Sequence, residues 1–331
     1  MSTAFTFLPL GAIIQEFHVN GINIVQGFQT ASQYKQHNAP YFGETIGRIA
    51  NRVAKGQIDS LNGKSYQLPV NNGPNSLHGG EQGWGKREFE GPVSVERNGE
   101  DAVLFTYLSR DGEEGYPGTV QVRVWYVQKK EQVEGVQQEV LYIEYEAELV
   151  GDQVEETAIN MTNHSYFNLT GKPSIAGTEV TLITNKYQVV DNGGIPTGPI
   201  EEYPGITGGK SFTLGEKEPD VDDCFVANTD ARSIPVDTRS SPLQKLVAAY
   251  HPETKIHLEV HSTEPAFQFY TGKYIDVPAV DGLPARAARS GFCVEPSRYV
   301  NAINVPEYRS MMILKKGQKY GARIVYRGWT A

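Results

Sequence analysis

The stretch VQVRVWYVQKKEQVEGVQQEVLYIEYEAEL, residues 120–149, decides the fold class of this chain. In Val120–Tyr126 apolar residues occupy every second position, and the same alternation runs through Leu141–Leu149. A period of two places alternate side chains on opposite faces of a half-buried strand. The polar segment 129–139, which contains Gly135, lies between the two runs. The stretch therefore predicts two antiparallel strands joined as a hairpin with a solvated tip.

Similar short apolar runs recur along the chain, and turn residues separate them. Further strands are expected at Ile13–Val19, Ile22–Gln26, Val103–Leu108, Ile256–His261, Phe267–Tyr270, Met312–Leu314 and Ala322–Tyr326. Dipeptides such as Asn62-Gly63 and Asp111-Gly112 mark turns between such runs. Helical signal is thin: Ser241-Pro242 supplies an N-cap and a first-turn proline, which predicts about two helical turns over residues 243–250.

The organisation of the chain favours one large β-structure over several units. No strand–helix alternation, fixed-period repeat or low-complexity linker divides it. The 34 glycines and 19 prolines suit many turns. We therefore predict an all-β protein: a single antiparallel β-sandwich domain over residues 1–331, with very little helix.

Composition and charge exclude several classes of protein. The net charge is −9 and no basic run is present, which argues against a nucleic-acid partner. No apolar run is long enough for a transmembrane helix, and the first 17 residues lack a basic segment typical of a signal peptide. Two cysteines, Cys224 and Cys293, are too few for a disulfide framework or a zinc cluster. A cytoplasmic, soluble protein without a membrane partner is expected.

Five segments concentrate polar residues in turn-rich surroundings, and they contain the candidate site residues. The segments are residues 47–52 (GRIANR), 75–80 (NSLHGG), 163–169 (NHSYFNL), 220–225 (DVDDCF) and 291–296 (GFCVEP). Glu295 ends an apolar run, where partial desolvation would raise its pKa towards that of a general base; the alternative is an edge carboxylate paired with Arg298. His164 fits either a proton donor beside aromatic residues or a histidine satisfied in the core.

The remaining candidates also have a structural alternative. His78 precedes a Gly-Gly turn, which suits a ligand contact or a tight turn alone. Asp222 and Asp223 belong to an acidic cluster that either binds sugar hydroxyls or forms a solvated turn. Arg52 by itself is compatible with a surface ion pair. On these residues alone the sequence supports cofactor-free acid/base chemistry on a polar, neutral ligand.

Two other groupings are not favoured as sites. His257, Glu259 and His261 share one face of a predicted strand at a spacing that zinc can use, but that face is the natural solvent face. Cys224 and Cys293 lack a neighbouring pattern that would activate a thiol. We predict neither a metal site nor a cofactor.

Seven motifs, taken together, resemble the aldose 1-epimerase (galactose mutarotase) family. They are GRIANRVAKG (47–56), NSLHGG (75–80), DGEEGYPG (111–118), NHSYFNL (163–169), DDCF (222–225), FQFYTG (267–272) and GFCVEP (291–296). They occur in the family's order and span nearly the whole chain. The resemblance implies a large β-sandwich with an open cleft that interconverts the α and β anomers of free hexoses such as galactose and glucose, without metal or nucleotide.

The resemblance also implies a role for each motif residue. Glu295 would be the general base and His164 the general acid. Hexose hydroxyls would be bound by Asn51, Arg52, His78, Tyr166, Asp222 and Gln268. The acid/base pair would need Glu295 ionised and His164 protonated near neutral pH. Asp223 stands where many members have histidine, so it competes with Asp222 for the ligand role, and Ser297 stands where glutamine is common.

Three alternative functions remain open at this point. A hexose-6-phosphate 1-epimerase on the same fold would need cationic contacts, of which only Arg52 is evident. A non-catalytic sugar-binding or sensor protein would not need both Glu295 and His164. A glycosidase would need two carboxylates across one bond, supplied by Glu295 and Asp222 or Asp223. The expected partner is a small hexose, and the chain is a monomer or a homodimer.

Overall fold

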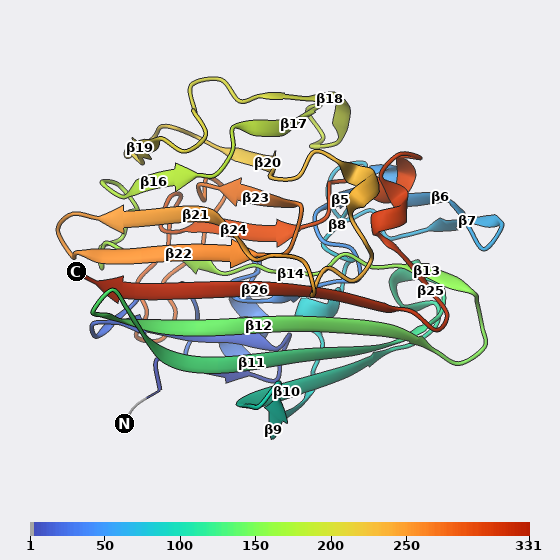
Figure 1. Cartoon of the computed structure of the whole chain (residues 1–331), viewed down its shortest axis with the longest axis horizontal. Coiled ribbons are helices and arrows are strands. Elements are labelled where there is room, and N and C mark those ends of the chain that lie inside the picture. The colour runs from blue at the N-terminus through green and yellow to red at the C-terminus, as the bar shows by residue number, and fades with distance from the viewer. Residues whose placement is uncertain (1–2) are drawn as a thin grey trace.

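Two large antiparallel sheets dominate the computed structural model, which describes residues 3–331. The larger sheet has nine strands (Figure 1). In spatial order they are β19 (Ser211–Thr213), β16 (Glu179–Leu182), β21 (Gln244–His251), β22 (Ile256–Ser262), β26 (Lys319–Thr330), β12 (Val136–Val150), β11 (Thr119–Val133), β10 (Glu100–Ser109) and β9 (Glu90–Arg97). The all-β, antiparallel prediction is confirmed.

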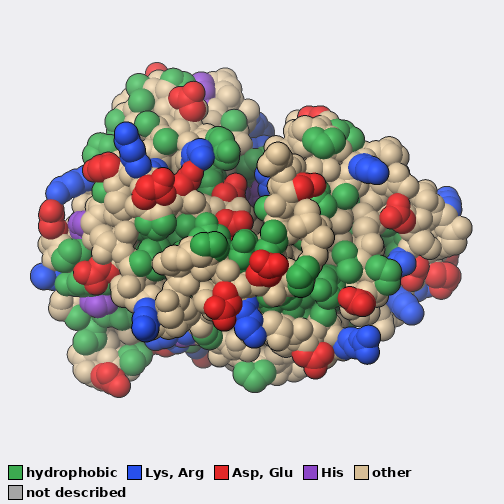
Figure 2. All heavy atoms as spheres, turned by 90° about the horizontal axis from the view of Figure 1, so that it is seen from above, with side chains coloured by type: hydrophobic (Ala, Val, Ile, Leu, Met, Phe, Trp, Pro, Cys, Tyr) green, Lys and Arg blue, Asp and Glu red, His purple; other side chains and the backbone are tan. Residues whose placement is uncertain are grey.

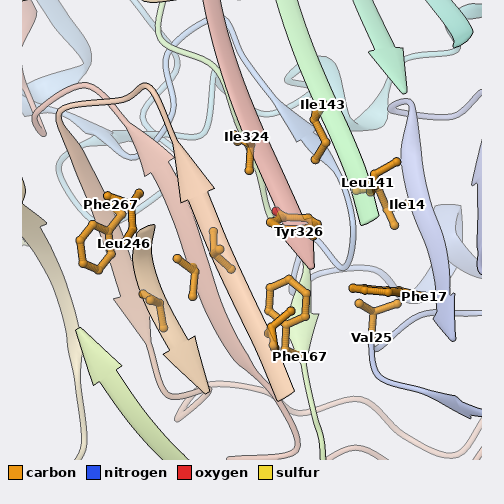
Figure 3. Close-up of a cluster of buried hydrophobic side chains, with 14 of the residues drawn as sticks. Ile14, Phe17, Val25, Leu141, Ile143, Phe167, Leu246, Phe267, Ile324 and Tyr326 are labelled. Atoms are coloured by element: carbon orange, nitrogen blue, oxygen red, sulfur yellow. The ribbon is translucent and has the colours of Figure 1, made fainter. Parts of the chain in front are cut away.

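The second sheet has six strands and carries much of the cleft described below. Its order is β15 (Tyr166–Phe167), β24 (Phe292–Ser297), β23 (Ala266–Tyr270), β20 (Asp222–Val226), β17 (Lys186–Val190) and β18 (Pro196–Glu202). One buried cluster draws side chains from both sheets, so their inner faces pack against each other. Figure 3 shows part of this cluster, where the ring of Phe167 on β15 lies 5.1 Å from that of Tyr326 on β26.

Smaller elements complete the sandwich. A three-stranded sheet comprises β1 (Phe5–Leu8), β2 (Ile13–Val19) and β3 (Ile22–Asn23). Four two-stranded pairs follow: β4 (Thr45–Ile46) with β14 (Thr162–Asn163), β5 (Arg52–Val53) with β8 (Ser76–Leu77), β6 (Gln57–Leu61) with β7 (Lys64–Gln67), and β13 (Glu156–Ala158) with β25 (Ile313–Lys315). Within residues 3–331 the helical elements are α1 (Ala31–His37) and the short 3-10 turns at Ala54–Gly56, Trp84–Lys86, Glu113–Gly115, Ala231–Ser233, Ala302–Asn304 and Arg309–Met311.

The hairpin of residues 120–149 forms as predicted, with longer strands. The polar segment 129–139 continues the antiparallel pairing of the two strands, because Val133 still pairs with Val136. The turn is reduced to Glu134 and Gly135, both at positive φ (51° and 83°). Two residues at positive φ are the requirement of the tight type I′ hairpin turn, whose twist matches that of the strands.

The predicted helix over residues 243–250 is wrong. Gln244–His251 forms β21, which pairs with β22 on one side and β16 on the other. From Val247 onward alternate side chains are buried, namely Val247, Ala249 and His251. Pairing on both edges and burial of this face outweigh the local Ser-Pro helix-start signal. The expected strand Ile22–Gln26 is likewise shorter, since only Ile22–Asn23 pairs as a strand.

The surface mixes charges of both signs. On the face seen in Figure 2, Lys and Arg side chains are dispersed among Asp and Glu side chains. Among residues 3–331, no helix has the length and apolar character needed to cross a bilayer.

Candidate active site

All eight predicted site residues line one cleft of about 450 Å³, a volume typical of small-molecule sites. They come from three parts of the fold that are far apart in sequence. These residues are Asn51, Arg52, His78, His164, Tyr166, Asp222, Gln268 and Glu295.

The six-stranded sheet supplies the acidic and amide groups of the cleft. Glu295 of β24 lies directly opposite Gln268 of β23 in the ladder, so their side chains share one face. Asp222 opens β20, the next strand, and its Oδ1 accepts a hydrogen bond of 2.8 Å from Gln268 Nε2. The sheet thus places the Asp222 carboxyl group, the Gln268 amide and the buried Glu295 carboxyl group on three neighbouring strands, facing the same side.

The β5–β8 pair supplies Asn51, Arg52 and His78. Asn51 and His78 are held together by two hydrogen bonds: His78 N–H donates to Asn51 O (3.0 Å), and Asn51 N–H donates to His78 Nδ1 (3.2 Å). Both residues have left-handed backbone conformations, φ 59° and 50°. Because Nδ1 of His78 is an acceptor, the proton of the neutral ring resides on Nε2.

His164 lies in the crossing between β14 and β15, where its backbone is bonded to the loop before β4. Its Nε2 is 3.4 Å from Oε1 of Glu295, and its Nδ1 is 3.6 Å from Sγ of Cys293. The side chains of His164 and Glu295 are each 5% exposed. Cys293 and Glu295 are two residues apart on β24, so one strand face contacts both nitrogens of the imidazole.

Burial controls the protonation of this pair. Desolvation raises the pKa of Glu295 well above its usual value, with a further rise from Asp222. Desolvation also lowers the pKa of His164 to about 3. Both shifts oppose charge on the pair, so burial works against the ionised carboxylate and imidazolium that acid/base catalysis requires.

A chain of hydrogen bonds connects the remaining polar groups. Asn51 Nδ2 donates a hydrogen bond to Gln268 Oε1 at 3.0 Å, and Gln268 Nε2 donates one to Asp222 Oδ1. Arg52 Nε donates to Asn72 Oδ1 at 3.1 Å, which fixes the guanidinium at the cleft. The groups are thus oriented before any ligand binds.

The geometry bears on two alternatives left open by the sequence. Asp222 lines the cleft, whereas the next residue on the strand, Asp223, hydrogen-bonds to Tyr203. Arg298 does not pair with Glu295, because its Nη1 lies 2.9 Å from a carboxylate oxygen of buried Glu264.

The three β22 residues at a spacing that zinc could use, His257, Glu259 and His261, make other contacts. The ring of His257 stacks on Trp329 at 5.0 Å, and His261 Nε2 lies 2.9 Å from Glu259. Inside the cleft, ligand atoms of His78, His164 and Glu295 all lie within 4.8 Å of one another. The Nε2 proton of His78 makes that nitrogen a hydrogen-bond donor into the cleft, and a metal ligand needs the opposite.

The cleft also contains residues that the sequence analysis missed: Ala39, Pro40, Tyr41, Asn72, Leu77, Tyr270, Tyr274 and Asp276. Tyr270 was within reach, because it belongs to the motif FQFYTG. Tyr41 carries no signal of its own in the sequence, since a tyrosine next to Pro40 is equally typical of an ordinary loop.

Named relatives cover most of the chain. A bifunctional protein GAL10 from Pachysolen tannophilus is 39% identical over 324 residues, which are 96% of this chain and 44% of that protein. The galactose mutarotase of Sus scrofa is 36% identical over 303 residues, 90% of this chain and 81% of that protein. The chain spans less than half the length of the bifunctional relatives that it matches.

Solved structures share the fold and the family model matches almost end to end. The aldose epimerase homologue from C. elegans superimposes with a TM-score of 0.82 at 24% identity, covering 99% of this chain and 95% of that one. Galactose 1-epimerase from Lactobacillus acidophilus gives 0.78 at 21% identity, with 99% and 92% covered. The family model described as aldose 1-epimerase matches residues 2–327. By this match and by the likeness to the mutarotase of Sus scrofa, the chain belongs to the aldose 1-epimerase family.

Proposed function

We propose that the chain catalyses the interconversion of the α and β anomers of free hexoses such as galactose and glucose. The observation that carries this proposal is the buried contact of 3.4 Å between His164 Nε2 and Glu295 Oε1 in a cleft lined by hydroxyl-binding groups. Opening a pyranose requires one proton to leave the C1 hydroxyl and another to reach the ring oxygen. An adjacent carboxyl and imidazole supply both functions.

In the proposed reaction the carboxylate of Glu295 accepts the proton of the C1 hydroxyl. The C1–O5 bond breaks as C1 becomes an aldehyde carbon, and O5 takes a proton from His164 Nε2. Rotation about C1–C2 exposes the other face of the aldehyde. The reverse transfers close the ring as the other anomer and restore both groups.

The acid/base pair becomes active by moving the single proton that it already holds. Transfer from the Glu295 carboxyl to His164 Nε2 gives a carboxylate and an imidazolium without any exchange with solvent. Arg52 favours this state, because its charge lowers the pKa of Glu295 against the effect of burial. Hexose hydroxyls that donate hydrogen bonds to the carboxylate act in the same direction.

The other cleft residues bind and orient the sugar in this proposal. Asp222 and Gln268 offer oxygen acceptors, while Arg52, Asn51 and the Nε2–H of His78 offer donors. Burial, together with His164, lowers the pKa of His78 well below its usual value, so His78 acts as a neutral donor. The reaction is an isomerisation whose two proton transfers are made by Glu295 and His164, so the proposal requires no cofactor.

Polarimetry on freshly dissolved α-D-galactose and α-D-glucose tests the proposal. The wild-type chain should accelerate the change in optical rotation, and Glu295→Gln should reduce kcat by about 10²–10⁴-fold. The variant keeps the shape of the buried side chain, so its melting temperature should not fall. A wild-type rate in Glu295→Gln would refute the assignment of the base, and no acceleration by the wild-type chain would refute the activity.

The same panel should include glucose 6-phosphate. Of the cleft-lining side chains in the described part of the chain, Arg52 is the one that is always cationic, and its Nε already donates to Asn72. We therefore expect free hexoses to react faster than the phosphate ester. A strong preference for the ester would favour the hexose-6-phosphate alternative.

We also propose that the chain acts in the cytoplasm. Cys224 and Cys293 are both buried and unpaired, which suits the reducing cytoplasm. Whether the chain acts as a monomer or a homodimer is a separate measurement, for example by light scattering.

A further inference from the structure

Tyr41 forms one wall of the cleft and has an unusual backbone conformation. It lies in the loop between α1 and β4 and has φ 68°, in the left-handed region. A bulky side chain in this region is uncommon, and such conformations persist where the surroundings enforce them. The loop around Tyr41 meets this condition.

Asn38, at the C-terminal end of α1, holds that loop with its side chain. Its Oδ1 accepts a hydrogen bond from Phe42 N–H at 2.8 Å, and its Nδ2 donates to Glu44 Oε1 at 2.8 Å. Both ends of the short segment 38–44 are therefore fixed to each other. Asn38 and Glu44 are buried, so water does not compete for these bonds.

The ring of Tyr41 contacts both histidines of the cleft and a cation. Its centroid is 4.8 Å from the ring of His78, at 64°, and 5.6 Å from that of His164, at 36°. Lys86 Nζ lies over the same ring, 4.7 Å from its centroid, and forms an ion pair with buried Glu44. A cation at this distance over a ring face attracts the ring.

The loop is also bonded directly to the backbone of His164. Gly43 N–H donates to His164 O at 3.0 Å, and His164 N–H donates to Glu44 O at 2.9 Å. The segment that positions the Tyr41 ring thus also fixes the main chain from which the catalytic imidazole extends. A shift in one would be transmitted to the other.

We infer that Tyr41 is a positioning residue that orients the imidazoles of His78 and His164, and that the Lys86–Glu44 pair holds its ring against them. The inference rests on the proposed mutarotase activity, because it assigns the orientation of that site's histidines. The essential property of Tyr41 is its ring; its hydroxyl group is not required.

The test compares Tyr41→Phe with Tyr41→Leu by polarimetry and by NMR of the histidine side chains. Tyr41→Phe keeps the ring and should retain kcat within about twofold. Tyr41→Leu should lower kcat by about tenfold or more with KM changed less than about threefold, because small misplacements of reacting groups cost large factors in rate. The ring signals of His78 and His164 should shift in Tyr41→Leu and stay in place in Tyr41→Phe.

A matched control is Tyr66→Leu. Tyr66 is also half-buried, has Lys64 Nζ 5.1 Å from its ring centroid, and packs in a cluster outside the cleft. Its loss should leave kcat and the signals of both cleft histidines unchanged. If Tyr41→Leu proves unfolded, Lys86→Met keeps the ring and removes its support, and it should still shift both histidine signals.

Three results would overturn the inference. They are wild-type kcat and histidine signals in Tyr41→Leu, an increase in KM alone, or wild-type histidine signals in Lys86→Met. If the wild-type chain fails to accelerate mutarotation while the histidine signals still follow the ring, the proposed activity fails and the positioning role of Tyr41 stands.

Discussion

The two histidines of the cleft are similar in burial and differ in how the protein engages their nitrogens. Nδ1 of His78 accepts a backbone N–H, which leaves a fixed donor, Nε2–H, facing the cleft. Nε2 of His164 faces Glu295, and its Nδ1 faces a thiol that remains protonated, because burial raises the pKa of Cys293 well above its usual value. One imidazole is therefore suited to bind and the other to exchange a proton.

This arrangement predicts an unusual dependence of rate on pH. The free pair of Glu295 and His164 holds one proton, and adding a second requires His164, whose pKa is lowered to about 3. Losing the last proton is opposed by the raised pKa of Glu295. We therefore expect kcat/KM to show no histidine limb between about pH 5 and pH 8, where an ordinary histidine acid would give a limb near its pKa of about 6.5.

Initial polarimetric rates at low galactose concentration, measured across this range, give kcat/KM and check the expectation. A limb close to pH 6.5 in either direction would contradict it, since a fall in rate above or below that pH would mean that His164 titrates there in the free site. Tris and phosphate should be compared at equal ionic strength, so that buffer catalysis of mutarotation is subtracted.

At the scale of elements, the tip of the β11–β12 hairpin offers a clean test of backbone energetics. A Cβ added to Gly135 would meet no atom within 4 Å, so a substitution there acts through conformation alone. Gly135→Ala, at φ 83°, should destabilise the fold by about 1 kcal/mol, whereas Glu134→Asn should stabilise it by a few tenths. Denaturation midpoints in urea measure both; a loss of stability in Glu134→Asn would contradict the I′ assignment.

Long strands with alternating residues could be predicted from sequence, and short ones could not. Ile13–Val19, and the segments that became β10, β22, β23 and β26, all lie within the strands observed. The two-residue strands β4, β5, β8, β14 and β15 position much of the cleft, yet two residues contain no period. The failure at β21 shows the limit of local signals, because its pairing partners lie elsewhere in the chain.

Part of the lining of the cleft could be predicted from sequence motifs, and the geometry of the cleft could not. Motifs identified Asn51 and Gln268, which form a hydrogen bond across 217 positions of sequence, but no spacing rule could have joined them. The pKa shifts of His164 and Glu295 depend on burial, which is a property of the assembled cleft. Tyr41 was missed because its importance comes from its contacts, and its motif is unremarkable.

At the scale of the whole molecule, the order of strands interleaves distant parts of the chain. β26, near the end of the chain, lies between β12 and β22 in the middle of the nine-stranded sheet (Figure 1). The cleft likewise combines residues from Tyr41 to Glu295. No cut through the sequence would leave two parts that each keep one of the two large sheets complete. We therefore propose that residues 1–331 form one folding domain, as the sequence analysis expected.

This proposal predicts a single unfolding transition that ligand shifts as a whole. In calorimetry the calorimetric and van't Hoff enthalpies should agree, which is the test of two-state behaviour. Galactose at about 100 times its Kd should add about 2.7 kcal/mol of stability, because it binds the folded cleft and not the unfolded chain. Since that cleft combines residues from Ala39 to Glu295, the entire transition should move to higher temperature. Two resolved transitions, or a shift confined to part of the transition, would show that the chain divides into separately folding units.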